Sequence, residues 1–350
     1  MFPAPHKALI RPRRGKTTVS QMLRGCEPGP MQTSGIMQII PLLSDLEDPD
    51  IVSPVNARFR TEAYGTMIFD NPSSNIMLIP CHAGYMVRQP AQDHAMSHAA
   101  FVKRESTVSF NDAMCIQQTQ PGFISPGSYS MMILPFPLRE KALQMREEKG
   151  FGKLWNYILE FNSDAGIEKT QAHLEYFFTR FEHELNEFAA EFEWVPRQVG
   201  AVILTGGEVV GVERCPSSEY FQSVWEPLIR ECYGSHALKA ARKETVSIPS
   251  SRVPLDLDSI ASLGDLRKAL DDAAAKEEMI ARGRIRDLIE EPFFYEEEDR
   301  LERYSLETVS NSQFIGQIVR DGERVCYLSL ITSDEWRRTR EWEAAKPFSI

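Results

Sequence analysis

A polar stretch in the first third of the chain contains the residue types and spacings best suited to chemistry. Asp93 precedes His94, and His98 follows four residues later. If the stretch were helical, both imidazoles would lie on one face and could bind a metal, with Asp93 as a third ligand or as the partner of one ring. A histidine with a pKa near neutrality can also act as a general acid or base. The alternative is a polar loop of exposed histidines.

The residues around this stretch complete one candidate site. We predict a catalytic group of His82, Asp93 and His94, and a ligand-binding group of Gly84, Gln92 and His98. We assign no metal and no cofactor to the chain. If the site acts on a nucleotide, these side chains must converge in one concave pocket and have perturbed pKa values.

The six cysteines are widely spaced and form no C-x-x-C pair, which disfavours zinc ribbons and thioredoxin-type redox sites. We expect them to be free thiols in a reducing, cytoplasmic compartment. Cys115 could act as a nucleophile paired with His82 or His94, but its apolar neighbours predict a buried, unreactive thiol. No apolar run approaches the roughly 20 residues that a membrane helix needs.

The formal net charge of −11 is unevenly distributed. The first 25 residues carry six Lys or Arg and no Asp or Glu, so the rest of the chain is strongly acidic. An acidic body disfavours a broad nucleic-acid surface, because phosphate recognition depends on Lys and Arg. The basic arm is therefore the candidate surface for a protein or assembly partner, through Lys7, Arg11, Arg13, Arg14 and Lys16.

Two predicted hairpins position the rest of the chain. Residues 199–213 read as strand, Gly-Gly turn and returning strand, and the pattern from Ser217 predicts a covering amphipathic helix. Pro227 should bend that helix or mark a later start. Residues 313–331 predict a second hairpin with the same Gly-Glu-x-Val pattern, which suggests an internal duplication or two equivalent hairpins in one sheet.

The remaining pattern predicts an α+β fold with mostly antiparallel sheets and long amphipathic helices packed on them. Short apolar runs separated by turns indicate a β-rich first half, whereas residues 138–161 and 167–194 predict helices. The second of these helices has a phenylalanine stripe that we expect in the core. The expected divisions are a basic extended arm (1–34), a main domain (35–236), a linker (237–258), a helix with the closing hairpin (259–335) and a tail (336–350).

This order of features resembles the ARPP family, whose name describes association with ADP-ribosylglycohydrolase, rhodanese and phosphatase-superfamily proteins. The resemblance rests on four segments of the sequence: Asn75–Pro80 followed by Gly84 and Gln92, Ala113–Gln117 followed by Gly122, Gly200–Trp225, and Gly316–Ile331. The resemblance implies a link to ADP-ribose handling or to RNA repair in biological conflict. It therefore implies a nucleotide-like or ADP-ribose-like ligand that the protein binds or processes.

The chain departs from the family pattern in the polar motif. Family members carry a Gly-Glu-Glu run and then Lys-Gln-Asn-Arg, whereas residues 83–85 here read Ala-Gly-Tyr and residues 91–94 read Ala-Gln-Asp-His. The resemblance therefore implies no activity that depends on that glutamate or arginine. The competing hypothesis is a non-catalytic protein of a larger assembly that binds its partner through the basic arm.

Overall fold

A ten-stranded antiparallel sheet is the largest element of the computed structural model, which describes residues 13–87, 91–119, 122–123, 129–242, 260–286, 288 and 291–345. Its strands follow the order β1-β17-β18-β19-β20-β16-β15-β4-β2, and β3 pairs with β4. Their bounds are β1 Arg13–Arg14, β2 Glu27–Pro28, β3 Gln32–Ser34, β4 Met37–Leu43, β15 Gln198–Thr205, β16 Glu208–Arg214, β17 Phe294–Leu301, β18 Tyr304–Ser310, β19 Phe314–Asp321 and β20 Arg324–Thr332.

The two predicted hairpins lie side by side at the centre of this sheet. β15–β16 and β19–β20 are joined by pairing between β16 and β20, in which Glu213 faces Ser329. Each hairpin has a register shift near its turn, between Ile203 and Leu204 in one and between Val319 and Arg320 in the other. The predicted strands, turns and antiparallel pairing are therefore confirmed.

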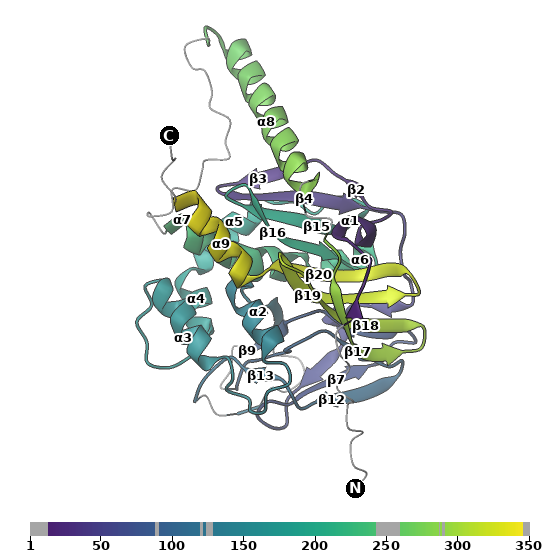
Figure 1. The fold of residues 1–350 in the computed structure, drawn as a ribbon. Coiled ribbons are helices and arrows are strands. Elements are labelled where there is room, and N and C mark those ends of the chain that lie inside the picture. Colours follow the sequence, from purple (N-terminus) through teal and green to yellow (C-terminus); the bar gives the residue numbers. More distant parts are fainter. Residues whose placement is uncertain are drawn as a thin grey trace.

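Three small sheets lie against one face of the large sheet (Figure 1). Their strands are β5 Ile51–Val52, β6 Arg58–Arg60, β7 Met67–Asn71, β8 Ile76–Ile79, β9 Ala83–Val87, β10 His94–Ala95, β11 Ala100–Val102, β12 Ser106–Phe110, β13 Met114–Cys115 and β14 Tyr129–Ile133, with a 3-10 turn at Pro54–Asn56. The sheets are β13-β10-β9-β14, β11-β8-β5 and β12-β7-β6. Burial of apolar side chains between these layers forms one continuous core.

Four helices form a layer beside the small sheets: α2 Phe136–Gln144, α3 Trp155–Asp164, α4 Glu175–Arg180 and α5 Glu182–Ala190. The predicted helix over 138–161 is thus two helices. The connecting turn contains Gly150 at φ +102°, a conformation that L side chains rarely adopt. The phenylalanine stripe of α4 and α5 is buried, as predicted, with Phe177 and Phe181 in a shared core with Leu185.

The covering helix changes its winding instead of ending at Pro227. α6 (Ser218–Glu226) is capped by the Ser217 hydroxyl, which accepts from the backbone N–H of Tyr220 at 3.1 Å. A π-helical segment (Pro227–Gly234) follows and continues into α7 (Ser235–Arg242). Pro227 has no N–H to donate to an earlier turn, so it fits at the first position of the wider helix. π-helical turns are frequent at functional sites.

The described part of the basic arm belongs to the fold. Arg13 pairs with Tyr295 in β1–β17. α1 (Val19–Met22) buries Val19 and Met22 against the large sheet. The paired strand and the packed helix differ from the extended arm expected over 1–34. Among the basic residues of the arm, Lys16 is exposed. Lys7, Arg11 and most of the predicted linker and its flank, residues 243–259, lie outside the described residues.

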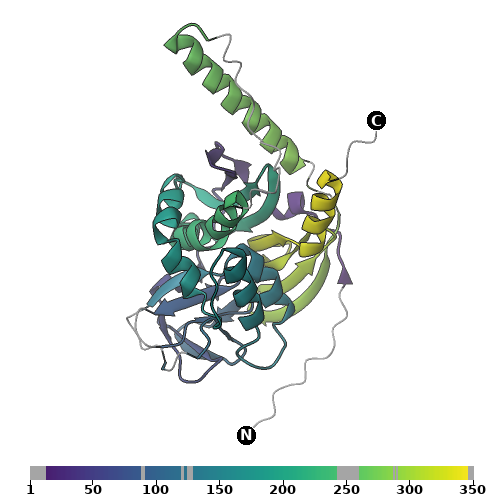
Figure 2. The ribbon, with the colours of Figure 1, turned by 90° about the vertical axis from the view of Figure 1, so that its left-hand side faces the viewer.

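Two helices end the described chain. α8 (Leu263–Arg286) extends away from the body of the molecule, and only its C-terminal end lies near the large sheet (Figures 1 and 2). α9 (Asp334–Ala345) follows β20 directly and lies beside α2. None of the helices in the described ranges is long and apolar enough to span a bilayer.

Candidate functional site

His94 holds the loop that precedes β7. It lies in β10, opposite Tyr85 on one side and Cys115 on the other. Its Nδ1–H donates to the carbonyl of Gln92 at 2.8 Å, and its Nε2 accepts from the backbone N–H of Gly65 at 3.2 Å. Burial lowers the pKa of His94, which agrees with a neutral ring engaged at both nitrogens. The helix required by the metal hypothesis is absent here, because His94–Ala95 is a strand.

Asp93 is buried beside β9, and the side-chain amide of Gln117 links it to the carboxylate of Glu175. Its Oδ1 accepts from the backbone N–H of Val87 at 2.8 Å. Its own N–H donates to Oε1 of Gln117, whose Nε2 donates to Glu175 at 2.9 Å. Burial raises the pKa of Asp93 to about 7. The bond from the Val87 N–H opposes this increase and the charge of Glu175 adds to it, but burial is the largest cause.

The predicted ligand-binding residues have separate environments. Gly84 pairs with Ala95 and Met132 inside the β10-β9-β14 sheet. Gln92 is buried, and its Oε1 has no hydrogen-bond partner among the described residues. His98 donates from Nδ1 to the carbonyl of Ala99 and from Nε2 to Oδ2 of Asp112, each at 2.6 Å.

His82 belongs to a different network, centred on the buried Arg139 of α2. The Nε–H of Arg139 donates to Nδ1 of His82 at 3.2 Å, and Nη1 donates to Oε1 of Glu213 at 2.7 Å. Nη2 donates to the hydroxyl of Ser329. Burial and the positive charge of Arg139 lower the pKa of His82 well below its ordinary value. His82 is therefore neutral in this network.

The π-helical segment completes the Arg139 network. It places Tyr233 so that the hydroxyl donates to Oε1 of Glu213 at 2.7 Å. A Cβ on Gly211 would lie 1.9 Å from that hydroxyl, so only glycine permits this approach. Arg139, Glu213 and Tyr233 are almost fully buried, and the ion pair joins α2 to the seam between the two hairpins. Burial and the Glu213 charge raise the pKa of Tyr233 well above its ordinary value.

The three predicted histidines thus belong to separate hydrogen-bond networks. No hydrogen bond joins His82, His94 and His98 to one another in the described part of the chain. Each ring has its own partners: burial lowers the pKa of His82 and of His94, whereas the bond to Asp112 raises that of His98. No group of three or more His, Cys, Asp or Glu side chains in the described ranges is placed to hold a metal ion. The catalytic role of His82, Asp93 and His94 stays a prediction.

A cluster of exposed aromatic rings lies directly beside the loop that His94 holds. The ring centroids of Tyr64 and Phe123 are 5.3 Å apart, and those of Tyr64 and Phe151 are 5.4 Å apart. These side chains are 43%, 46% and 36% exposed, and Phe294 is the only other exposed aromatic residue among the described side chains. We call Tyr64, Phe123 and Phe151 the aromatic surface.

The backbone beneath the aromatic surface is fixed by the strands that carry the predicted site. Gly65 has φ +75°, and a Cβ there would lie 2.9 Å from Cβ of Phe151, so a larger residue would separate the two loops. The N–H of Cys115 donates to the carbonyl of Phe151 at 2.8 Å. The Trp155 ring packs against Phe151 and donates to the carbonyl of Cys115 at 3.1 Å. β10 and β13 therefore position this surface.

Sequence reasoning did not identify either group. Arg139 was hidden in a predicted amphipathic helix, and only the fold brings it to Glu213. A local signal for the aromatic surface exists, because residues 149–153 read Lys-Gly-Phe-Gly-Lys. A large ring between two glycines and two lysines is unusual for a core segment and is typical of an exposed loop.

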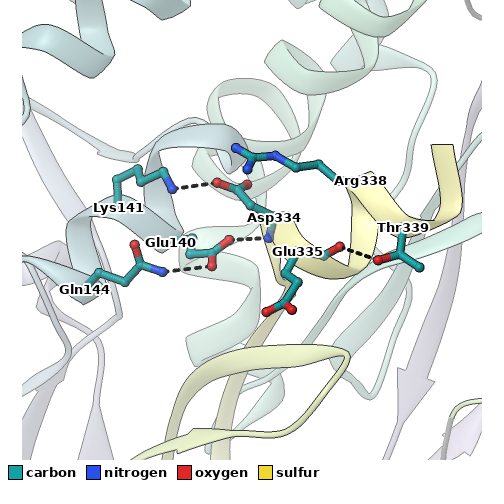
Figure 3. A pocket seen from close by; sticks show the side chains of 7 residues that line it. All are labelled: Glu140, Lys141, Gln144, Asp334, Glu335, Arg338 and Thr339. Atoms are coloured by element: carbon teal, nitrogen blue, oxygen red, sulfur yellow. Dashed lines mark hydrogen bonds and ion pairs between the residues drawn. The ribbon is translucent and has the colours of Figure 1, made fainter. Parts of the chain in front are cut away.

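A groove between α2 and α9, away from the aromatic surface, has a cavity volume of about 710 Å³. Figure 3 shows that its polar groups mainly bind one another. Lys141 pairs with Asp334 at 2.7 Å, and Glu140 accepts from the backbone N–H of Asp334 and from Gln144. These contacts join α9 to α2. Because the charged groups of the groove already bind one another, few of them are available to bind a ligand.

The comparison with family models agrees with this architecture. The model described as ARG and Rhodanese-Phosphatase-superfamily-associated Protein domain matches residues 25–330, which include both hairpins, the Arg139 network and the aromatic surface. Neither the curated proteins nor the solved structures give a match. Since the matched span covers most of the 350 residues, the chain belongs to the ARPP family.

Proposed function

We propose that the protein binds an adenine nucleotide or an ADP-ribose-type ligand at the aromatic surface. The observation that carries the proposal is that three of the four exposed aromatic residues among the described side chains lie together. Burial of apolar rings normally stabilises a fold, so a contiguous exposed group marks a binding surface. Stacking of a base on such a ring contributes about 1–3 kcal/mol to the free energy of binding.

The loop around Phe151 supports an anionic ligand. Lys149 is exposed and Lys153 is half-buried, and each lies two residues from the ring. Nζ of Lys153 donates to the carbonyl of Glu148 at 3.2 Å, which fixes the loop, whereas Lys149 faces solvent. An ammonium group beside a stacking surface suits a ligand that combines a base with phosphates. The chain beyond the basic arm is acidic overall, so this placement favours one local anion site.

In this proposal His94 is a positioning residue. Both ring nitrogens are engaged, and the bond to Gly65 holds Tyr64 at the surface. Loss of the ring would release the loop without removing any group that contacts the ligand. The proposal therefore concerns binding, and His94 contributes through the geometry of Tyr64.

Isothermal titration with ADP-ribose, ADP and adenosine tests the proposal. We expect Phe151→Ala to weaken ADP-ribose binding by about 10-fold or more, because one stacking contact is lost. Phe294→Ala is the matched control, since this ring on β17 is also exposed, at 43% against 36% for Phe151, and lies outside the aromatic surface. Lys149→Ala should weaken ADP-ribose and ADP but not adenosine. The proposal is wrong if no ligand binds or if Phe151→Ala behaves like Phe294→Ala.

A further inference from the structure

We propose that the ion pair between His98 and Asp112 regulates ligand binding at the aromatic surface, with tighter binding when His98 carries its proton. The inference rests on the proposed function, because it concerns the same surface. It goes further by assigning a control to residues that do not contact the ligand.

His98 has two acceptors and needs two protons to bind both. Nδ1 faces the carbonyl of Ala99 and Nε2 faces Oδ2 of Asp112, each at 2.6 Å. A neutral imidazole has a single N–H, so deprotonation must break one of these bonds. A neutral ring also no longer forms an ion pair with the carboxylate of Asp112, so the charge-assisted bond is lost. The geometry therefore requires the imidazolium form.

Asp112 lies in the loop that holds the aromatic surface in place. On one side of it, Oδ1 of Asn111 accepts from the hydroxyl of Thr66 at 3.4 Å. On the other side, the N–H of Ala113 donates to the carbonyl of Gly65 at 3.1 Å. Because the two neighbours of Asp112 bind Gly65 and Thr66, the two residues that follow Tyr64, the position of the Asp112 loop sets the position of the Tyr64 ring.

The other charged groups near the pair also favour a protonated His98 and an ionised Asp112. Ser97 donates from its hydroxyl to Asp112 at 3.5 Å. The charge of Lys153 on the neighbouring loop favours the ionised form of Asp112, and that of Glu298 on β17 favours the protonated form of His98. His82 is the remaining titratable group, and it is neutral in the Arg139 network. Burial lowers the pKa of His98, but the bond and charge of Asp112 outweigh it and raise the pKa.

The consequence is a binding surface that loosens as the pH rises. Below the pKa of His98 the pair anchors the loop and Tyr64 is held for stacking. Above it, the loop loses one of its anchors and the ligand must order it again, which reduces affinity. Adenosine carries no phosphate, so the same pH dependence with adenosine excludes a change in phosphate ionisation as its cause.

Titration of the full chain with ADP-ribose and adenosine at about pH 6 and about pH 9 tests the inference. We expect at least about a fivefold loss of affinity at the higher pH, the lower end of common coupling. His98→Gln and Asp112→Asn should each abolish this dependence. His183→Gln should retain it, because this histidine forms an exposed pair with Glu187 on α5.

The midpoint of the wild-type affinity profile should also match the His98 titration followed by nuclear magnetic resonance. This comparison needs no variant, so it decides the matter even if His98→Gln does not fold. Affinity independent of pH, or a dependence that both substitutions retain, overturns the inference but leaves the proposed function standing. Absence of binding at every pH overturns both.

Discussion

Nη1 of Arg139 and Oε1 of Glu213 lie 2.7 Å apart in an almost fully buried site at the seam of the two central hairpins. Neither charge contacts bulk water, so each depends on the other for compensation. Burial opposes the charge of Arg139, but the carboxylate of Glu213, together with the neighbouring Cys232 and Tyr233, raises the pKa of Arg139 well above its ordinary value. The pair therefore ties α2, β16 and the π-helical segment into one unit.

Removal of Arg139 should strongly destabilise the protein. Arg139→Met leaves the Glu213 carboxylate buried without its cation, and we expect the free energy of unfolding to fall by about 3–5 kcal/mol. Urea unfolding measures this change. Arg60→Met is the control, because the Arg60–Glu62 pair is largely exposed and its loss should cost less than about 1 kcal/mol. Equal losses in the two variants would contradict the role given to Arg139.

Asp93 should make the protein less stable as the pH rises from about 4 to about 7. Its folded pKa of about 7 lies above the ordinary value of 3.8, because burial disfavours the ionised form. The folded state thus binds a proton more tightly than the unfolded state, and the stabilisation present at low pH is lost as the pH approaches 7. Asp93→Asn keeps the acceptor for Val87 and should remove this component. Urea midpoints at several pH values provide the measurement, and an unchanged pH profile in the variant would rule the assignment out.

Much of the fold follows from local patterns in the sequence. The Gly-containing turns, the alternating apolar strands and the phenylalanine stripe predict the hairpins, the antiparallel sheets and the helical layer, because each pattern is set by the period of its own element. The pairing of the two hairpins with each other is non-local. No residue in either hairpin signals that β16 lies next to β20.

The surroundings of the candidate site are less predictable from the sequence than the fold, for the same reason. Gln92, Asp93 and His94 have the residue types of an active site, but their burial and partners depend on where β9, β13 and Gly65 lie. The helix over 93–98 that metal binding would require does not form, because His94 pairs with Tyr85 and Cys115 in a strand. Tertiary contacts therefore prevent the helix in which the four-residue spacing of His94 and His98 would suit metal binding.

Gly211 should tolerate no side chain. A Cβ there would lie 1.9 Å from the Tyr233 hydroxyl, so Gly211→Ala must displace Tyr233 from Glu213. We expect a loss of about 1–3 kcal/mol in the free energy of unfolding, typical of an overpacked core. Gly283→Ala in α8 meets no atom within 4 Å and should stabilise slightly, by about 0.5–1 kcal/mol. If Gly211→Ala left the free energy of unfolding unchanged, the bond between the Tyr233 hydroxyl and Glu213 would not depend on the absence of a side chain at position 211.

Cys26 should be the thiol of the native protein that alkylating reagents modify first, because burial raises its pKa but leaves its side chain partly exposed. It is half-buried, whereas the other five cysteines are buried. Burial raises the pKa of Cys115 to about 11 and that of Cys232 to about 12, so neither forms a thiolate near neutral pH. Mass spectrometry after brief treatment with iodoacetamide identifies the modified residue. Rapid modification of Cys115 in the native state would revive it as a candidate nucleophile.

Hydrogen–deuterium exchange with and without saturating ADP-ribose tests the central claim most directly, because it locates the ligand without any substitution. We predict slower exchange in peptides covering residues 61–66 and 149–155, and unchanged exchange in peptides covering residues 291–310. Protection confined to the groove between α2 and α9, or no protection anywhere, would contradict a ligand site at the aromatic surface.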